Sequence, residues 1–198
     1  QGLFGDLGSG GEVKNLSVGG TVTALSNIGS IAGNNNGTIE NCFSDATVTG
    51  TGTLIGGIAG RNTSGTIENC VNVGKVSGSG SVGSIVGGVD LHYIRNCYYL
   101  RGTADYGIGG KDHGTSSRTA ADFASGEATY KLQKGSSTLI WGQKLSGAGK
   151  DTYPTLTSDM TKKVYKVSLM TNEYGEFYYR EYFGVYGNKD DTVTLPAH

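Results

Sequence analysis

The chain has 198 residues, of which 35 are glycine, two are proline and three are cysteine. Glycine does not stand at every third position, which excludes collagen, and the abundance of Val, Ile and Thr argues against a disordered chain. The net charge of −1 arises without clusters of Lys or Arg, which argues against nucleic acid and anionic membranes as partners.

A six-residue motif recurs through the first half of the chain. The letters GTIENC occupy residues 37–42 and 65–70, and a shortened copy, YIRNC, occupies residues 93–97. The aligned apolar residues of the successive copies are Val13, Ile39, Ile67 and Ile94, spaced 26, 28 and 27 residues apart. Internal repeats of this length indicate a solenoid or another stacked architecture.

The residues between the motifs favour short strands over helices. Each motif is followed by a triplet such as T47-V-T and then by a glycine-flanked apolar run such as G56-G-I-A-G. Helical repeats avoid glycine, and the leucine ladder of a leucine-rich repeat is missing. We therefore predict an all-β fold, a right-handed parallel β-solenoid (β-helix) of about 3.5 rungs. Each rung would contain about three short strands, stacked ~4.8 Å from the next.

In such a solenoid, a position that recurs in every repeat becomes a column along the stack. One predicted column, a structural ladder, consists of Leu16, Cys42, Cys70 and Cys97. Three further apolar columns are Val13/Ile39/Ile67/Ile94, Val22/Val48/Val76 and Ile31/Ile58/Ile85. We expect these columns to form the core. The Asn before each ladder residue (Asn15, Asn41, Asn69 and Asn96) is expected at a bend with left-handed backbone. The glycines at 33, 60 and 87 would allow either positive φ or close backbone approach.

This arrangement resembles the GLUG-motif repeats of bacterial surface proteins, on the strength of G56-G-I-A-G-R-N followed by G65-T-I-E-N-C. The resemblance covers roughly residues 2–100. It implies a secreted or surface location and a structural or adhesive role. Such repeats occur in immunoglobulin-A-cleaving peptidases and haemagglutinin-like adhesins, outside any catalytic domain. The third unit departs from the pattern at G87-G-V-D-L-H-Y, where we expect the solenoid to end.

The second half of the chain has a different composition. Residues 98–117 are interpreted as a glycine-rich loop, and residues 119–135 as one short helix beginning after Thr119. Trp141 and the segment 153–156 are expected to cover the open end of the solenoid. We place the repeats at 1–100, a capping region at 101–160 and a small β segment at 161–198.

The final segment has the alternation of a small β module. Residues 162–171 and 176–183 favour two strands around a turn at 172–175, with a third strand at 192–196. It resembles the start of a Listeria–Bacteroides repeat, through V-Y-K-V-S-L and V-T-L-P. Gln1 falls within a repeat pattern, so we expect the chain to be a piece of a longer protein. The sequence contains no apolar run of the ~20 residues that span a membrane.

No residues of the sequence make a convincing catalytic, cofactor or metal site. The cysteines lack CxxC spacing and the three histidines are scattered, so we interpret the cysteines as buried thiols. Asp112 and His113 share one loop with Ser116 and Ser117, whereas a catalytic triad needs convergence from separate elements. Glu40 and Glu68 are interpreted as a solvated ladder. We predict no enzyme and no cofactor.

Aromatic side chains are the remaining candidates for ligand contact. Tyr98, Tyr99 and Tyr106 border the predicted loop, and with Trp141 they would suit a glycan or protein, although packing in the core or cap is the alternative. We expect an extracellular, non-catalytic adhesin or stalk, which presents neighbouring modules or contacts host glycan or protein. The alternative is a carbohydrate-binding or polysaccharide-processing β-helix module.

Overall fold

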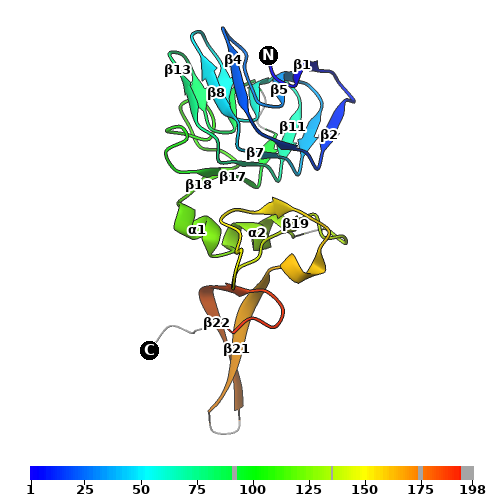
Figure 1. Ribbon diagram of the computed structural model, residues 1–198, viewed down its shortest axis with the longest axis vertical. Helices are drawn as coiled ribbons and strands as arrows, with labels where there is room; N and C mark the ends of the chain where they lie inside the picture. The colour runs from blue at the N-terminus through cyan, green and yellow to red at the C-terminus, as the bar shows by residue number, and fades with distance from the viewer. Residues whose placement is uncertain (91–92, 135, 174–175, 193–198) are drawn as a thin grey trace. The chain divides into compact units, whose positions relative to one another are not determined.

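Two compact units make up the chain, residues 1–119 and residues 120–198. The computed structural model describes residues 1–90, 93–134, 136–173 and 176–192. The loop 101–119, which we expected in a separate capping region, belongs to the first unit. The first unit is a parallel β-solenoid, as predicted, in which strands of successive turns lie side by side (Figure 1).

The strands of the first unit group into narrow parallel sheets that run along the solenoid. The first sheet contains β1 (Phe4–Leu7), β5 (Ala32–Asn35), β10 (Ala59–Asn62) and β15 (Val86–Val89). The second contains β2 (Glu12–Lys14), β6 (Thr38–Glu40), β11 (Thr66–Glu68) and β16 (Ile94–Arg95). The third contains β3 (Ser17–Val18), β7 (Phe43–Ser44), β12 (Val71–Asn72), β17 (Cys97–Leu100) and β18 (Thr115–Arg118). The fourth contains β4 (Thr21–Ala24), β8 (Thr47–Gly50) and β13 (Val76–Gly78), and the fifth β9 (Ile55–Gly56) and β14 (Val82–Gly83).

The second and third turns contain more strands than we predicted. The second turn lies wholly within the described residues and contains five strands, β6 to β10, where we expected about three. The glycine-flanked run accounts for part of the difference, because β9 ends at Gly56 and β10 begins at Ala59. A corner at Gly57 therefore divides what looked like one strand, and the left-handed Asn41 divides β6 from β7 in the same way.

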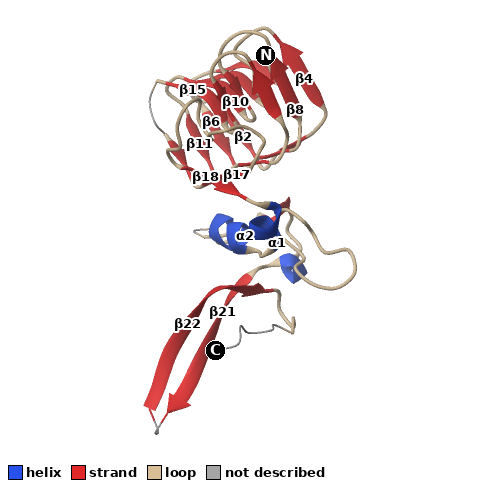
Figure 2. Ribbon diagram, turned by 90° about the vertical axis from the view of Figure 1, so that its left-hand side faces the viewer, coloured by secondary structure: helices blue, strands red, loops and turns tan. Residues whose placement is uncertain are grey.

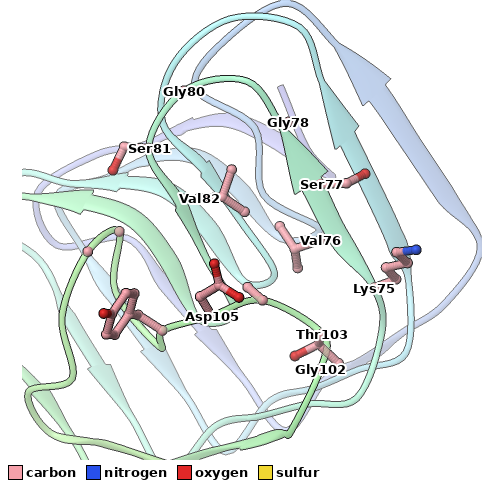
Figure 3. Close-up of a pocket in the computed structure, with 14 residues that line it drawn as sticks. Lys75, Val76, Ser77, Gly78, Gly80, Ser81, Val82, Gly102, Thr103 and Asp105 are labelled. Carbon is pink, nitrogen blue, oxygen red and sulfur yellow. The ribbon is translucent and has the colours of Figure 1, made fainter.

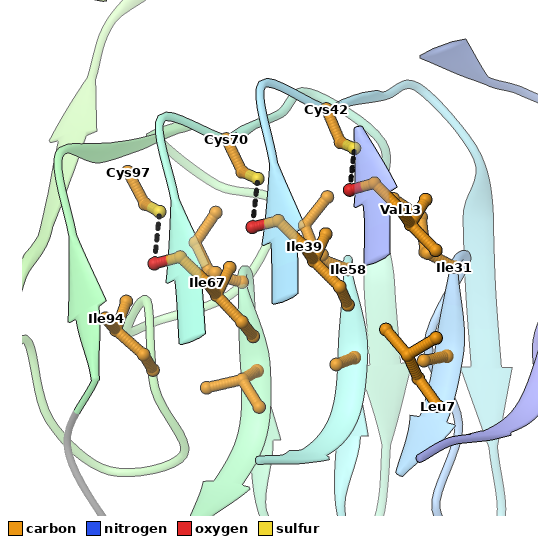
Figure 4. Close-up of a cluster of buried hydrophobic side chains, with 14 of the residues drawn as sticks. Leu7, Val13, Ile31, Ile39, Cys42, Ile58, Ile67, Cys70, Ile94 and Cys97 are labelled. Atoms are coloured by element: carbon orange, nitrogen blue, oxygen red, sulfur yellow. Dashed lines mark hydrogen bonds between the residues drawn. The ribbon is translucent and has the colours of Figure 1, made fainter. Parts of the chain in front are cut away.

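The predicted apolar columns lie in register and form the core. Ile67 pairs with Ile39 on one side and with Ile94 on the other, and Val48 pairs with Val22 and Val76. Ile31, Ile58 and Ile85 are fully buried and joined by backbone hydrogen bonds from turn to turn. The larger core cluster holds the isoleucine and cysteine columns (Figure 4), and a smaller cluster gathers around Ile28, Val48, Ile55 and Val76.

The corners of the solenoid contain asparagines with left-handed backbone and glycines that allow close backbone approach, as the sequence suggested. Asn15, Asn41, Asn69 and Asn96 have φ of 56°, 52°, 52° and 51°, which confirms the left-handed bend. Asn96 Nδ2 donates to Asn69 Oδ1 at 2.6 Å, which joins two of these bends. Gly33, Gly60 and Gly87 lack positive φ and instead serve close approach: a Cβ at Gly87 would overlap the backbone nitrogen of Ile55.

Two asparagines lie inside the solenoid in a column whose ends are apolar. Asn35 pairs with Leu7 below and Asn62 above, and Asn62 pairs with Val89. Both asparagines are fully buried, and Asn35 Nδ2 donates to Asn62 Oδ1 at 2.7 Å. Asn62 Nδ2 donates in turn to Gly65 O at 2.8 Å, so the pair satisfies turn backbone that faces the interior.

The second unit begins with helices. We predicted one helix over residues 119–135, but the described residues of this stretch form two, α1 (Ala120–Ala124) and α2 (Glu127–Leu132). Gly126 separates the helices because its φ of 87° is incompatible with a continuing helix. Phe123 and Leu132 are buried, and the Phe123 ring meets Tyr153 edge to face with 5.6 Å between the ring centroids.

A long hairpin follows the helices. Short strands β19 (Trp141–Gly142) and β20 (Thr155–Leu156) pair antiparallel, and a 3-10 turn covers Met160–Lys162. Strands β21 (Tyr165–Glu173) and β22 (Glu176–Gly187) then pair antiparallel (Figure 2), which agrees with the two predicted strands. The third predicted strand, at 192–196, falls almost wholly outside the described residues. Among the described helices, none is long and apolar enough to cross a membrane.

Candidate functional site

The fourth turn of the solenoid takes a shorter path than the turn beneath it. In the third turn, the carbonyls of Lys75 and Gly83 accept hydrogen bonds from the second turn, and seven residues (76–82) separate them. In the fourth turn, the corresponding acceptors are Thr103 and Tyr106, and only two residues (104–105) separate them. The fourth turn therefore omits the corner that β13, its following loop and β14 make in the third turn.

The short cut leaves a hollow of about 630 Å3, which we call the notch. It is lined by residues 75–78 and 80–82 of the third turn and by residues 102–106, 109 and 110 of the fourth. Figure 3 shows Asp105 facing the third-turn segment that carries Val76 and Val82. Lys75 and Asp105 supply one charge of each sign, so the notch has no strong preference for a cation or an anion.

Comparison with the second turn shows that the notch is a surface that another turn would normally cover. Gly50 and Gly78 are paired in register, but Gly50 is buried beneath the third turn and Gly78 is exposed. Likewise Ile55 is fully buried, whereas its partner Val82 is only partly buried. The two strands concerned, β13 and β14, are the last described members of their sheets on this side.

The backbone at this edge points hydrogen-bonding groups into the notch. Neighbouring residues of a strand in a parallel ladder direct their N–H and C=O groups to opposite sides. The carbonyls of Ser81 and Gly83 accept bonds from the second turn, so the groups of Val82 face the fourth turn. By the same alternation, Lys75 O faces β8 and the backbone groups of Gly78 face the notch. No described strand pairs with either residue there.

Asp112 fixes the loop that borders the notch. Its Oδ1 accepts hydrogen bonds from Gly107 N at 2.7 Å, Thr115 Oγ1 at 3.0 Å and Tyr99 OH at 3.1 Å. Burial, together with the Asp112 carboxylate, raises the pKa of Tyr99 to about 12. The bonds hold Asp112 as a structural anchor, and Ser116 and Ser117 pair with Tyr98 and Tyr99 in the ladder of β17 and β18.

Most of the four aromatic residues considered for ligand contact are buried. Trp141 is 0% exposed, Tyr99 2% and Tyr98 5%, whereas Tyr106 is 45% exposed and lines the notch. Tyr98 OH donates to Asn96 Oδ1 at 2.7 Å, and the Arg118 guanidinium lies 5.3 Å from its ring centroid. Of these four residues, only Tyr106 lies at an accessible hollow. Ligand contact by any of the four stays a prediction.

The cysteines lie one above another inside the solenoid (Figure 4). Each thiol donates to the carbonyl two residues before it, at 3.2–3.3 Å, and approaches a carbonyl of the preceding turn at 3.7–3.8 Å. Burial raises the pKa of Cys70, and its thiol lowers the pKa of Cys42 by hydrogen bonding. These contacts describe small buried side chains that fill a column.

Two of the acidic residues on the solenoid surface, Glu40 and Glu68, lie in a column with basic residues. Glu40 and Glu68 stack in register, as expected, and the column continues to Lys14 on one side and Arg95 on the other. Lys14 lies 3.6 Å from Glu40, and Arg95 lies 2.7 Å from Glu68. The described residues contain no group of three or more His, Cys, Asp or Glu placed to hold a metal ion.

The repeat geometry agrees with a known family model. The model of the GLUG motif matches residues 24–49 and 51–77. This chain carries GLUG repeats. Each GLUG match runs from one fourth-sheet corner to the next, so that the first ends at β8 and the second within β13. The notch therefore begins at the end of the second matched GLUG repeat, whose residues 75–77 line it.

A solved structure supports the architecture around the GLUG repeats. The chain is similar to the crystal structure of a candidate immunoglobulin A1 protease from Bacteroides ovatus, with a TM-score of 0.57 and 23% sequence identity. The similarity covers 78% of this chain and 62% of that chain. At this identity it is a likeness of fold. No curated protein sequence matches the chain.

Sequence reasoning did not find the notch. The signal is a difference in spacing. The segment between K75-V-S and the next apolar run is longer than the corresponding segment after R101-G-T-A. The loop 98–117 no longer follows the GLUG pattern, so its residues could not be aligned by letter. Only the hydrogen bonds of Thr103 and Tyr106 to the third turn show that this loop is a shortened turn.

Proposed function

We propose that the chain is a non-catalytic segment of a bacterial secreted or cell-surface protein, which acts as a spacer or adhesive stalk for neighbouring modules. The observation that carries this proposal is the continuous isoleucine column of the solenoid. Ile31, Ile58 and Ile85 are joined by backbone bonds of 3.0 and 2.9 Å, and all three are fully buried. A stack of identical contacts makes a stiff unit that each added repeat extends by ~4.8 Å.

The GLUG repeats and the likeness to the Bacteroides ovatus structure support this reading of the solenoid. Catalysis would require titratable groups that are free to reach a substrate. Instead, Asp112 accepts three hydrogen bonds from the protein, and Glu40 and Glu68 stand in a column of ion pairs. These groups stabilise turns and surface, which suits a spacer better than an active site.

Three assays test the role. Antibodies to the solenoid should label intact, unpermeabilised cells that produce the protein, and beads coated with the purified chain should adhere to host-derived surfaces. The purified chain should leave immunoglobulin A1 uncut over a long incubation. Confinement of the protein to the cell interior, or cleavage of immunoglobulin A1 by the purified chain, would overturn the proposal.

The alternative function, a carbohydrate-active β-helix module, makes a different prediction. Of the aromatic candidates, only Tyr106 is both exposed and beside a hollow. Binding on a glycan array that is abolished by Tyr106→Ala, with an unchanged circular dichroism spectrum, would favour a carbohydrate-binding module over a spacer. Binding to no glycan agrees with the spacer.

A further inference from the structure

The notch has the properties of an interrupted β-ladder. Its third-turn wall is an edge that other turns of the same solenoid cover, as the burial of Gly50 and Ile55 shows. Its fourth-turn wall is held at both ends by backbone bonds, Val76 N to Thr103 O at 2.9 Å and Ser84 N to Tyr106 O at 2.8 Å. Between these two bonds the ladder stops.

We propose that the notch binds a peptide segment of a partner protein, which bends with the corner of the third turn and adds short extended stretches to the open edges of β13 and β14. The backbone groups of Gly78 and Val82 would supply the hydrogen bonds. Strand addition of this kind takes its affinity from main-chain bonds and its specificity from side-chain pockets. The inference goes beyond the proposed spacer role, because the notch can bind a peptide wherever the protein resides.

The lining of the notch indicates which side chains would fit. Val82 and Ala104 are partly buried and pack against the smaller core cluster, so they present a small apolar surface. Tyr106 is 45% exposed at the rim. A β-branched or other small apolar residue of the peptide would lie on Val82 and Ala104, continuing the ladder that pairs Val82 with Ile55. Lys75 and Asp105 allow polar flanking residues of either charge.

The shape of the solenoid end favours a single peptide over a second copy of the chain. The third sheet continues past β12 with β17 and β18, and the second continues past β11 with β16. The end is therefore stepped, and the open edge is recessed behind strands that extend further. A flat first turn of another molecule would meet these longer sheets first, whereas a narrow extended segment enters the recess.

The test uses the full chain and a fluorescent peptide that copies residues 47–56 (TVTGTGTLIG), the turn segment that contains β8 and β9. Fluorescence polarisation should show saturable binding at one site. The same peptide with alternate backbone nitrogens methylated keeps every side chain and loses strand donors. It should bind at least about tenfold more weakly, which corresponds to about 1.4 kcal/mol. Equal binding of both peptides would overturn the proposal.

Matched variants place the site. Val82→Pro removes the N–H that faces the notch, and proline is tolerated at such edge positions. We expect it to weaken peptide binding at least about tenfold, whereas Val82→Ala, which keeps the N–H, should weaken it less than about threefold. Thr23→Pro is the control at the opposite edge, because Gly20 O accepts from Thr47 and residue 23 therefore faces away from β8. It should bind normally.

Three further outcomes of these experiments would count against a peptide site at the notch. All variants should keep the circular dichroism spectrum of the parent, and a peptide-binding loss shared by Thr23→Pro would overturn the assignment of the site. Self-association that Val82→Pro abolishes would identify a second copy as the occupant instead. Glycan binding at the notch without peptide binding would also overturn the proposal.

Discussion

Replacing Asn62 by valine tests whether the buried asparagine pair stabilises the solenoid. Valine is the residue that the next turn places at this position, since Asn62 pairs with Val89. The change is therefore compatible with the column in shape and removes only the polar contacts. Asn62 makes two of these, accepting from Asn35 Nδ2 at 2.7 Å and donating to Gly65 O at 2.8 Å.

The expected loss follows from the groups left behind. Asn35 Nδ2 keeps a longer contact to Thr66 O at 3.3 Å, but Gly65 O lies in a buried turn and loses its bond from Asn62. A buried group left without a partner costs about 1–3 kcal/mol, and two such groups cost about 2–6 kcal/mol. The added apolar surface of valine offsets about 1–2 kcal/mol of that. We expect Asn62→Val to lower the free energy of unfolding by about 2–3 kcal/mol, the middle of the difference between these two ranges.

Urea denaturation followed by far-UV circular dichroism measures this free energy. A cycle with Asn35→Ala and the double variant should show a coupling of about 0.5–3 kcal/mol, because the two side chains bond directly. Asn34→Ala is the control, since Asn34 stands beside Asn35 and its amide bonds the exposed Asp6 at 2.6 Å. If Asn62→Val were as stable as the parent, or if the two asparagines showed no coupling, the reasoning would be refuted.

Three further predictions follow from single side chains. Asn69→Ala should destabilise the solenoid by about 1 kcal/mol more than Asn69→Gly, because φ is 52° there and the left-handed region strains alanine; urea denaturation yielding the opposite order would contradict this. Tyr99 has a raised pKa of about 12 in the folded state, so it stabilises the fold fully below its unfolded value near 10, and this stability is lost as pH rises through 12. Tyr99→Phe should remove that part of the alkaline loss, which melting temperatures from pH 9 to 12 would measure against the parent. Cys42, Cys70 and Cys97 should react with a thiol reagent in 6 M guanidinium but resist it in buffer, since all three are buried, and rapid labelling in buffer would show that the column opens readily.

The sequence predicts the register of the solenoid because register is a property of repetition. When the same apolar residue recurs at a fixed period, as Ile39 and Ile67 do, only one stacking buries all copies together. The left-handed conformation of the asparagine before each cysteine could be predicted for a related reason. It is among the few residues that tolerate φ near 50°, so its recurrence specifies a backbone conformation as well as a side chain.

The buried asparagines could not be found in this way. Asn35 and Asn62 follow glycine-rich runs and precede turns, where asparagine is usually exposed. Their burial depends on the inward direction of the carbonyl of Gly65, which follows from the corner and not from any single residue. The exposure of the aromatic candidates could not be predicted for a similar reason. Tyr99 and Tyr106 are the same residue type, yet Tyr99 is 2% exposed and Tyr106 is 45% exposed.

The way the solenoid ends explains why the open edge lies where it does. Tyr99 occupies the column that Ser44 and Asn72 fill in earlier turns, and its larger ring covers the end of the larger core cluster, together with Ile108. Over the smaller cluster the fourth turn supplies only Ala104. At the smaller cluster, Val82 and Ala104 therefore stay partly exposed, and the backbone groups of the strand edge stay open. An exposed strand edge invites unwanted pairing, and proteins limit this risk by keeping such edges short. Strands β13 and β14 have three and two residues, so the edge is too short to template a sheet but long enough to hold a few residues of an extended peptide.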